Sequence, residues 1–245
     1  RQSIYVFAGL IMMIFISHLK PDSYKNILMH SYWIGLLLLI YVLFNPAEGY
    51  TTSRWIDIGF FQFQPSEIIR LILPLSIVAY LHRKESKIRL EDWLYTTLAA
   101  LMCSYLVFEQ PDLGTSIIVF TSGIIPIYLA GLPYRVIAAY VGMLAIVSPF
   151  IWSSLLDYQK QRVLTYFDSN VDPLGDGWNI AQSQTAIGSG GFFGKGYLEG
   201  TQSQLNFIPE SHSDFIFSVI GEEFGLLGIT CLFIVYGMII WRIFK

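Results

Sequence analysis

Charged residues are scarce in this sequence. They make up 13% of its 245 residues, whereas hydrophobic residues make up 54% and the mean hydropathy is +0.53. An average soluble domain carries about 25% charged residues, so this composition excludes an ordinary soluble globular protein. The formal net charge of −3 also excludes a basic protein that binds nucleic acid.

Cysteine is equally rare. Cys103 and Cys231 are the two cysteines, and both fall in apolar runs. Two such residues provide neither a disulfide framework nor the ligand spacing of a metal site. The sequence also lacks an acidic or basic block of the kind that marks a disordered interaction tail.

Long apolar runs, in contrast, recur along the whole chain. Seven of them are near the length that about 30 Å of hydrocarbon requires. They lie at residues 3–19, 27–44, 68–81, 93–108, 113–130, 136–155 and 215–240. The sequence therefore predicts an all-α polytopic membrane protein, with residues 1–245 forming one membrane domain of about seven transmembrane helices.

Basic residues predict which side of the membrane each connection occupies. They gather in alternate short connections or ends, at Lys20, Lys25, Arg83, Lys84, Lys87, Arg89, Arg135, Arg242 and Lys245. These connections are predicted to be cytoplasmic. The opposite side then holds a long stretch, residues 157–213, whose many aromatic and aliphatic side chains indicate a structured extracytoplasmic loop rather than a disordered one.

Polar residues at the start of the third apolar run are the first candidate site. Pro65 and Ser66 indicate the start of a helix, and Glu67 in its first turn is favoured by the helix dipole. Arg70 lies on the same face, one turn deeper, where a charge in a span needs a partner or water. The two residues can form a structural ion pair, or they can present a cation to an anionic ligand.

Two further polar segments lie on the same predicted side. Asp112, in the turn QPDLG, is placed to cap the following helix. Residues 188–196 are rich in glycine but do not match a phosphate-binding loop, because Ser189 stands at the position of the first glycine, Gly196 replaces the Ser or Thr, and no strand precedes the segment. The glycines can serve a loop that needs positive φ angles, or can bring Lys195 to a diphosphate.

The segment before the last apolar run carries the main catalytic candidate. Asp214, Ser218 and Glu222 repeat at every fourth position and predict one polar face on a helix. A carboxylate at the mouth of such a face is a candidate general base, whereas Ser211 with Asp214 can instead form a capping box. Glu222 lies deep enough to require a groove or a cation, although Glu222 and Glu223 can equally meet Arg70 or loop backbone.

Four segments together resemble a known family. They are RWIDIGFFQFQPSE, QPDLGTS, RVLTYFDSNVDPLGDGWNIAQSQTAIGSGGFFGKG and NFIPESHSDFIFSVIGEEFGLLG. The residues of these segments and their order along the chain resemble those of the SEDS family (shape, elongation, division and sporulation), and within it those of the RodA-like, rod-shape branch. Members of this family typically have about ten spans, so the resemblance implies that this chain lacks the first helix and the last two.

The resemblance implies a function. The family consists of glycosyltransferases of the bacterial cytoplasmic membrane that polymerise lipid II into peptidoglycan, alongside a class B penicillin-binding protein and other membrane proteins of the elongation machinery. On that analogy Asp214 is the essential carboxylate, and Glu67 and Arg70 face the same outward cavity. Family members usually carry Lys where this chain has Arg70, and an arginine cannot supply a neutral amine.

The chemistry implied is an inverting transfer of the sugar from its diphosphate. Asp214 is the predicted base, and the predicted substrate contacts are Glu67, Arg70, Arg54, Lys195, Glu210 and His212. Asp112, Ser218 and Glu222 are predicted to line the polar groove. A divalent cation, Mg or Mn, held by Asp214 and the diphosphate is the alternative, with Asp214 as a ligand rather than a base.

Two rival functions fit the same residues. Charges within the membrane and helices broken by proline or glycine are also typical of transporters, so a lipid II flippase is one alternative. The polar groups gather at one side, however, whereas a flippase needs them from face to face. The second alternative is a scaffold without catalytic activity that activates the penicillin-binding partner.

Overall fold

The computed structural model describes residues 2–18, 21–45, 54–57, 62–84, 88–168, 171–173, 175–205, 207–208 and 213–245. Helices dominate this part of the chain, and α1 (Gln2–Ser17), α2 (Pro21–Phe44), α3 (Pro65–His82), α4 (Leu90–Glu109), α5 (Leu113–Leu129), α6 (Tyr134–Ser154) and α10 (Ile216–Phe244) coincide with the seven predicted spans. The remaining helices are α7 (Asp157–Phe167), α8 (Asp176–Ser189) and α9 (Thr201–Gln204).

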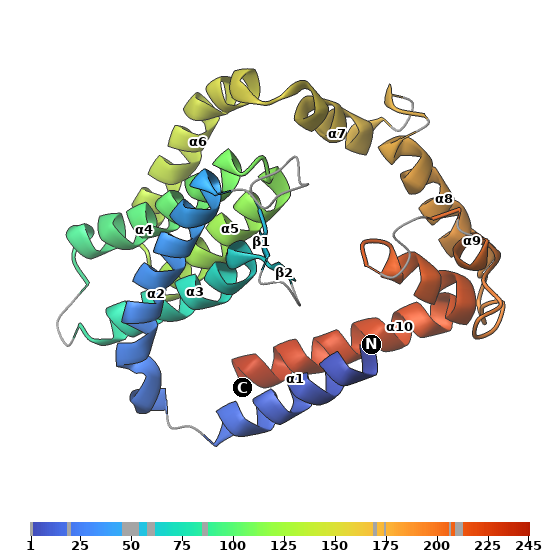
Figure 1. Cartoon of the computed structure of the whole chain (residues 1–245), viewed down its shortest axis with the longest axis horizontal. Coiled ribbons are helices and arrows are strands. Elements are labelled where there is room, and N and C mark those ends of the chain that lie inside the picture. Colours follow the sequence, from blue (N-terminus) through green and yellow to red (C-terminus); the bar gives the residue numbers. More distant parts are fainter. Residues whose placement is uncertain are drawn as a thin grey trace. The chain divides into compact units, whose positions relative to one another are not determined.

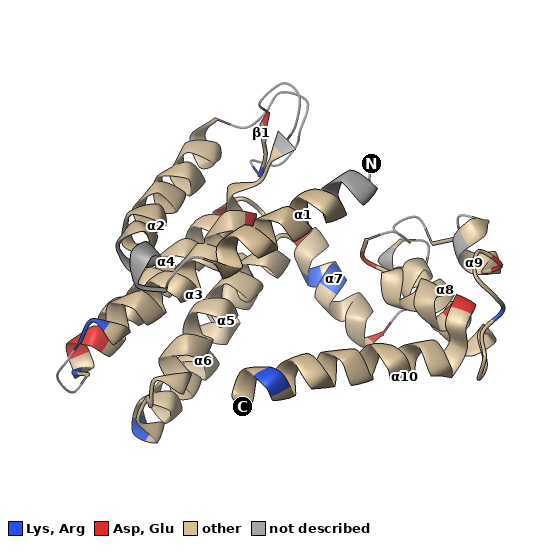
Figure 2. Ribbon diagram, turned by 90° about the horizontal axis from the view of Figure 1, so that it is seen from below, with Lys and Arg blue, Asp and Glu red and all other residues tan. Residues whose placement is uncertain are grey.

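The prediction of an all-helical membrane bundle is confirmed. By length and composition, four of the described helices can cross a bilayer, in the windows Ile27–Phe44, Pro65–His82, Tyr134–Ser154 and Ile216–Phe244. Two shorter apolar helices, Val6–Ser17 and Leu113–Leu129, accompany them. Figure 2 shows these helices almost free of charge along their lengths, with acidic and basic residues gathered at helix ends and connections.

The chain divides into two compact units, Arg1–Ile146 and Val147–Lys245, with the boundary inside α6. The first unit is built around α2, α3, α4 and α5, which lie side by side (Figure 1). The second unit consists of the end of α6 and α7 to α10, with α8 packed against the first part of α10. The single membrane domain expected from the sequence stays a prediction.

A short antiparallel ladder is the exception to the helices in the described residues. Strands β1 (Ile56–Asp57) and β2 (Gln62–Phe63) pair with Ile56 opposite Phe63. The ladder leads directly into α3, which begins at Pro65 as the sequence predicts. Proline suits this position because the first helical N–H has no partner within the helix and the ring already has the helical φ angle.

The core of the first unit is apolar and closely packed. Its buried side chains come from α2, α3, α4 and α5, and include Leu39, Leu73, Val107 and Val119. Two glycines allow the helices to approach closely. A Cβ at Gly35 would lie 2.6 Å from Ile69, and one at Gly123 would lie 2.7 Å from the Cβ of Ala100. Small residues at crossings are typical of membrane helices, where close van der Waals contact replaces the hydrophobic effect.

Gly123 provides a test of this packing. We expect Gly123→Leu to destabilise the protein by about 1–3 kcal/mol, because the added side chain forces α5 away from α3 and α4. Thermal unfolding of the purified protein in detergent measures the change. Gly142→Leu is the matched control, since a Cβ at Gly142 in α6 meets no described atom within 4 Å. Equal stability of the two variants would contradict the proposed close crossing.

Candidate functional site

The first turn of α3 presents an ion pair. Arg70 bonds the carboxylate of Glu67 one turn earlier, and their side chains are 39% and 43% exposed. Glu67 lies at the positive end of the helix dipole, which favours a carboxylate there. The sequence allowed this pair to be a structural ion pair or a cation presented to an anionic ligand. The ion pair is present, and the exposure of the guanidinium leaves it accessible to a further anion.

A second cation lies where the ladder meets the turn between α4 and α5. The guanidinium of Arg54 donates from Nε to the carbonyl of Gln110 at 3.1 Å and from its other end to the carbonyl of Pro111. Its Nε also lies 3.7 Å from the carboxylate of Asp112. Asp112 caps α5 as the sequence predicts, accepting from the N–H of Thr115 at 3.2 Å. Arg54 therefore ties the ladder to this turn.

Two buried polar atoms near these pairs have no hydrogen-bond partner in the described part of the chain. They are the hydroxyl of Ser66 and the side-chain carbonyl oxygen of Gln110. The amide nitrogen of Gln110 is used, since it donates to the carbonyl of Leu39 at 3.2 Å. Buried polar atoms without protein partners are suited to bind water or a polar ligand. The start of α3 and the end of α4 therefore offer polar binding capacity.

In the second unit, α10 is broken at Gly225, and the glycine-rich turn after α8 occupies the break. Gly225 has φ 63° and ψ −158°, a conformation that essentially only glycine adopts. An unbroken helix would bond Leu226 to Glu222 and Leu227 to Glu223. Here the N–H groups of Leu226 and Leu227 bond instead to the carbonyls of Gly191 and Phe192, at 2.9 and 3.1 Å.

The turn also satisfies the two carbonyls left open by the break. Lys195 N–H donates to the carbonyl of Glu222 and Gly196 N–H to that of Glu223, both at 3.0 Å. Gly191, Gly194 and Gly196 have positive φ angles, which is the structural role that the sequence offered as one reading of these glycines. The backbone of the turn is therefore engaged with α10.

The side chain of Glu222 is completely buried and ionically paired. Its carboxylate accepts from the Nζ of Lys195 at 2.7 Å, from the hydroxyl of Thr201 at 3.0 Å and from the N–H of Gln202 at 3.0 Å. Ser218, one turn earlier, is also buried and bonds the hydroxyl of Ser183 in α8. Both members of the predicted polar face within α10 thus point toward α8, α9 and the glycine-rich turn.

Asp214 differs from these two residues in exposure. It lies in the turn before α10, whose first residue is Ile216, and its side chain is exposed. The capping box of Ser211 with Asp214 is wrong, because Phe215 is the N-cap and Asp214 therefore precedes the helix. Glu210 and His212 lie outside the described residues, so the two predicted substrate contacts stay predictions. Of the two predicted site carboxylates that the structure describes in the second unit, Asp214 and Glu222, Asp214 is thus the one that solvent can reach.

The structure brings together three pairs of predicted site residues: Glu67 with Arg70, Arg54 with Asp112, and Lys195 with Glu222. The sequence reasoning missed Thr201, Gln202 and Ser183, since nothing in their local pattern marks them. It also missed the break at Gly225, although a glycine in an apolar run was visible. No group of three or more His, Cys, Asp or Glu side chains that could hold a metal occurs among the described residues.

An unpredicted polar network joins α3 and α4 at the other end of the first unit. Asp92, just before the predicted span that starts at residue 93, accepts from Lys84 at 2.7 Å, Tyr80 at 2.9 Å and the N–H of Arg89 at 3.0 Å. These bonds, that of Lys84 foremost, lower the pKa of the Asp92 carboxyl to about 2. The network bonds the end of α3 to the start of α4, at the connection that the sequence predicts to be cytoplasmic.

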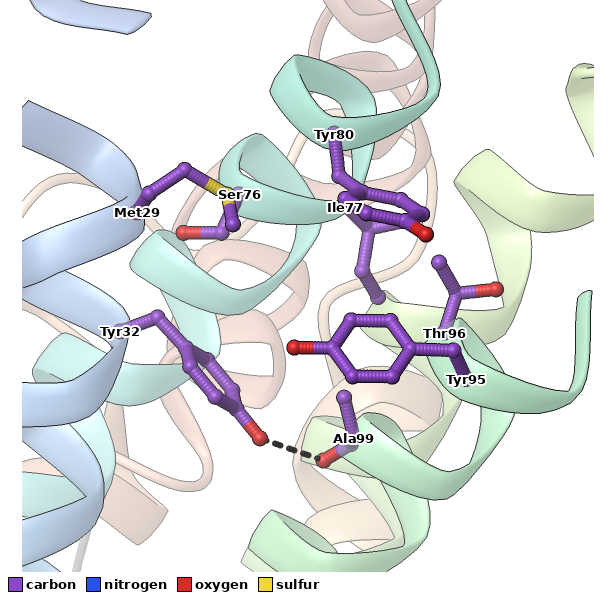
Figure 3. Close-up of a pocket in the computed structure, with 8 residues that line it drawn as sticks. All are labelled: Met29, Tyr32, Ser76, Ile77, Tyr80, Tyr95, Thr96 and Ala99. Atoms are coloured by element: carbon purple, nitrogen blue, oxygen red, sulfur yellow. Dashed lines mark hydrogen bonds between the residues drawn. The ribbon is translucent and has the colours of Figure 1, made fainter. Parts of the chain in front are cut away.

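A small pocket lies beside this network, between α2, α3 and α4 (Figure 3). Tyr32 and Tyr95 point into it, and the hydroxyl of Tyr32 donates to the carbonyl of Ala99 at 3.4 Å. The lining residues are Met29, Tyr32, Ser76, Ile77, Tyr80, Tyr95, Thr96 and Ala99. None of them is a predicted site residue, so within the first unit this pocket has no residue in common with the polar cluster at the start of α3.

Comparison with known proteins finds similarity along the whole chain. The sequence model of the family described as "Cell cycle protein", FtsW/RodA/SpoVE, matches residues 1–245. The chain is 42% identical over 235 residues to peptidoglycan glycosyltransferase MrdB of Escherichia coli K12, which is 96% of this chain and 64% of that protein. It is 34% identical over 221 residues to the probable peptidoglycan glycosyltransferase FtsW of Halorhodospira halophila, covering 85% of this chain and 54% of the relative.

Solved structures show the same similarity. A chain from a study of how a peptidoglycan synthase complex coordinates polymerization and crosslinking matches with a TM-score of 0.76 and 30% identity, over 98% of this chain and 67% of that one. The rod shape determining protein RodA of Thermus thermophilus matches with a TM-score of 0.63 and 25% identity, over 98% and 62%. The chain thus spans less than two thirds of the curated relatives' length.

The break in α10 predicts an effect of substitution. We expect Gly225→Ala to lower stability by at least about 1–3 kcal/mol from backbone strain alone, with the clash of its Cβ against the glycine-rich turn adding to this. That Cβ would lie 2.4 Å from the backbone nitrogen of Gly194. Thermal unfolding measures the loss. Gly237→Ala, where no described atom lies within 4 Å, should leave stability unchanged, and a Gly225→Ala protein as stable as this control would contradict the break.

The Asp92 network predicts a pH dependence of stability. The folded-state pKa of Asp92, about 2, lies below the unfolded value of about 3.9, so the ionised carboxylate stabilises the fold. This contribution is complete above the unfolded value and is lost as the pH falls through the folded one. Stability measured by denaturation from pH 6 to 2 should therefore decline less steeply in Asp92→Asn than in the parent protein. Identical slopes would contradict the assignment.

Proposed function

The chain belongs to the FtsW/RodA/SpoVE family, and on that premise we propose that the protein polymerises lipid II into peptidoglycan glycan strands at the outer face of the bacterial cytoplasmic membrane. The observation that carries the proposal is the similarity over 96% of this chain to a protein named as a peptidoglycan glycosyltransferase. The similarity to the rod shape determining protein RodA of Thermus thermophilus, together with the RodA-like motifs of the sequence, favours a role in cell elongation and rod shape.

The proposed reaction is an inverting glycosyl transfer. A hydroxyl of the acceptor sugar attacks the anomeric carbon of the donor, and the bond from that carbon to the diphosphate oxygen breaks. Asp214 takes the proton of the attacking hydroxyl, and the lipid diphosphate leaves with the bonding electrons. Such chemistry needs a base for the hydroxyl and positive charge for the leaving group. Asp214 is suited to the first task because its side chain is exposed.

Arg70 is suited to the second task. Its guanidinium is exposed, and its pairing with Glu67 leaves donors that can hold a diphosphate in the planar, bidentate manner typical of arginine. The side chain of Arg70 is 39% exposed, against 27% for those of Arg54 and Lys195, so Arg70 is the leading candidate among the three predicted cations. Ser66 and Gln110, with buried polar atoms unsatisfied in the described chain, can bind sugar hydroxyls or water.

We further propose that the protein works with a class B penicillin-binding protein and with other membrane proteins of the elongation machinery. Support comes from the similarity to a chain studied within a peptidoglycan synthase complex that joins polymerization and crosslinking. Polymerisation by this chain would supply glycan strands to a crosslinking partner. We also propose that the protein resides in the cytoplasmic membrane, which the apolar helices and the proposed lipid substrate support.

Substitution of Asp214 tests the proposal. We expect Asp214→Asn in the full-length protein, purified with its penicillin-binding partner, to lose at least about 10²-fold in polymerisation of labelled lipid II, because the base is removed without a change of shape. Gel analysis of the glycan strands measures the product. Asp157→Asn, an exposed aspartate at the start of α7, is the matched control and should keep full activity.

The outcomes also separate the alternatives. Strands made at the parental rate by Asp214→Asn would contradict the catalytic role and favour the scaffold. Movement of lipid II across a vesicle membrane without strand formation by the parent protein would favour the flippase. Loss of activity in the parent protein on chelation of Mg or Mn, with recovery on addition of the cation, would make Asp214 a metal ligand rather than the base.

A further inference from the structure

We propose that Lys195 and Glu222 form a positioning pair for the glycosyl transfer, fixing the helix that follows Asp214 to the extracytoplasmic segment that starts at α9. This inference rests on the proposed function. It assigns Lys195 a role that acts through Glu222 rather than on the diphosphate of the substrate. The argument starts from the number and origin of the bonds made by one buried carboxylate.

Glu222 is at the meeting point of three chain segments. Its own helix, α10, carries it; Lys195 comes from the glycine-rich turn; and Thr201 and Gln202 open α9. The turn contributes one donor and α9 two, all within 3.0 Å of the carboxylate that α10 carries. Lys195 also donates to the hydroxyl of Thr201 at 2.9 Å, so the donor from the turn is bonded directly to one of the two donors from α9.

The backbone reinforces the same junction. Lys195 binds Glu222 twice, with its N–H on the carbonyl and with its Nζ on the carboxylate. The break at Gly225 makes that carbonyl available, since the N–H of Leu226 bonds the turn instead. The side-chain pair and the backbone bonds therefore fix the position of the glycine-rich segment along the axis of α10. That position is eight residues after Asp214, which corresponds to about two turns of an α-helix.

Charge is what distinguishes this pair from ordinary packing. A buried ion pair is commonly no more stabilising than a hydrophobic pair of similar volume, but removal of one partner leaves a buried charge and is strongly unfavourable. Glu222 is 0% exposed, and the Lys195 side chain is 27% exposed. A pair of this kind specifies one arrangement of the segments it joins. Here the arrangement is that of α9 and the glycine-rich turn around α10, the helix that begins two residues after the proposed base.

A double-mutant cycle in the full-length protein with its penicillin-binding partner tests the inference. The variants are Lys195→Met, Glu222→Gln and the two combined, assayed for lipid II polymerisation as kcat and KM. We expect each single variant to lower kcat by about 10- to 100-fold, because small misplacement of a catalytic group is costly. KM should stay within about twofold of the parent value, because the pair does not bind substrate.

The combined variant is the decisive one. It removes both charges together, so it folds where a single variant with an uncompensated buried charge fails to do so. Its kcat should be no lower than that of the worse single variant, as expected for residues that act as a unit. Exchange of amide hydrogens at residues 197–205 should rise in all three variants. Lys160→Met and Glu199→Gln, in the same extracytoplasmic stretch, are matched controls expected to keep parental kcat.

Other results overturn the inference. A rise in KM on Lys195→Met that is equally large in the Glu222→Gln background would return Lys195 to diphosphate binding. Parental kcat in all three variants would remove the positioning role while leaving the proposed function intact. Absence of strands from the parent complex would instead overturn the proposed function, and the positioning role with it.

Discussion

A backbone polar group within the hydrocarbon of a membrane must find a partner in the protein, and the second unit is organised by this requirement. The break of α10 at Gly225 opens two carbonyls and two N–H groups inside an apolar helix. All four are satisfied by the glycine-rich turn that follows α8. The turn is therefore a structural part of the helix, and the segments on either side of it, α8 and α9, are located by that engagement.

The charged side chains of the predicted site also differ according to whether protein groups already bind them. Arg54 donates to the carbonyls of the α4–α5 turn, and Lys195 is bound to Glu222, so both cations stabilise contacts within the protein. Arg70 and Asp214, in contrast, are exposed. Polar residues in one sequence motif can thus differ in task, because burial and partners decide which charge remains available to a ligand. The chemistry that we propose depends on the exposed ones.

Local features of this structure could be predicted from the sequence, and long-range ones could not. The apolar runs located all seven long helices, and local side-chain chemistry located the start of α3 at Pro65 and the cap of α5 at Asp112. The i, i+4 pattern identified Ser218 and Glu222 as one polar face, but a pattern along one helix does not name partners elsewhere. Thr201 and Gln202 are about twenty residues away, and their role depends on how the loop folds back. For the same reason a glycine in an apolar run did not distinguish a close helix crossing, as at Gly123, from a break, as at Gly225.

The two kinds of glycine have different evolutionary freedom. At Gly123 an added methyl group would meet the side chains of Ala100 and Leu73, so a smaller residue at either position can compensate for a larger one here. At Gly190, Gly194 and Gly225 it would meet backbone atoms of the opposing segment, at 2.0, 2.1 and 2.4 Å. No exchange of side chains moves a backbone atom of that kind out of the way. Second-site suppressors should therefore arise readily for a substitution at Gly123 and rarely for one at the other three glycines. Relatives that keep the broken helix and its glycine-rich turn should therefore keep glycine at all three positions.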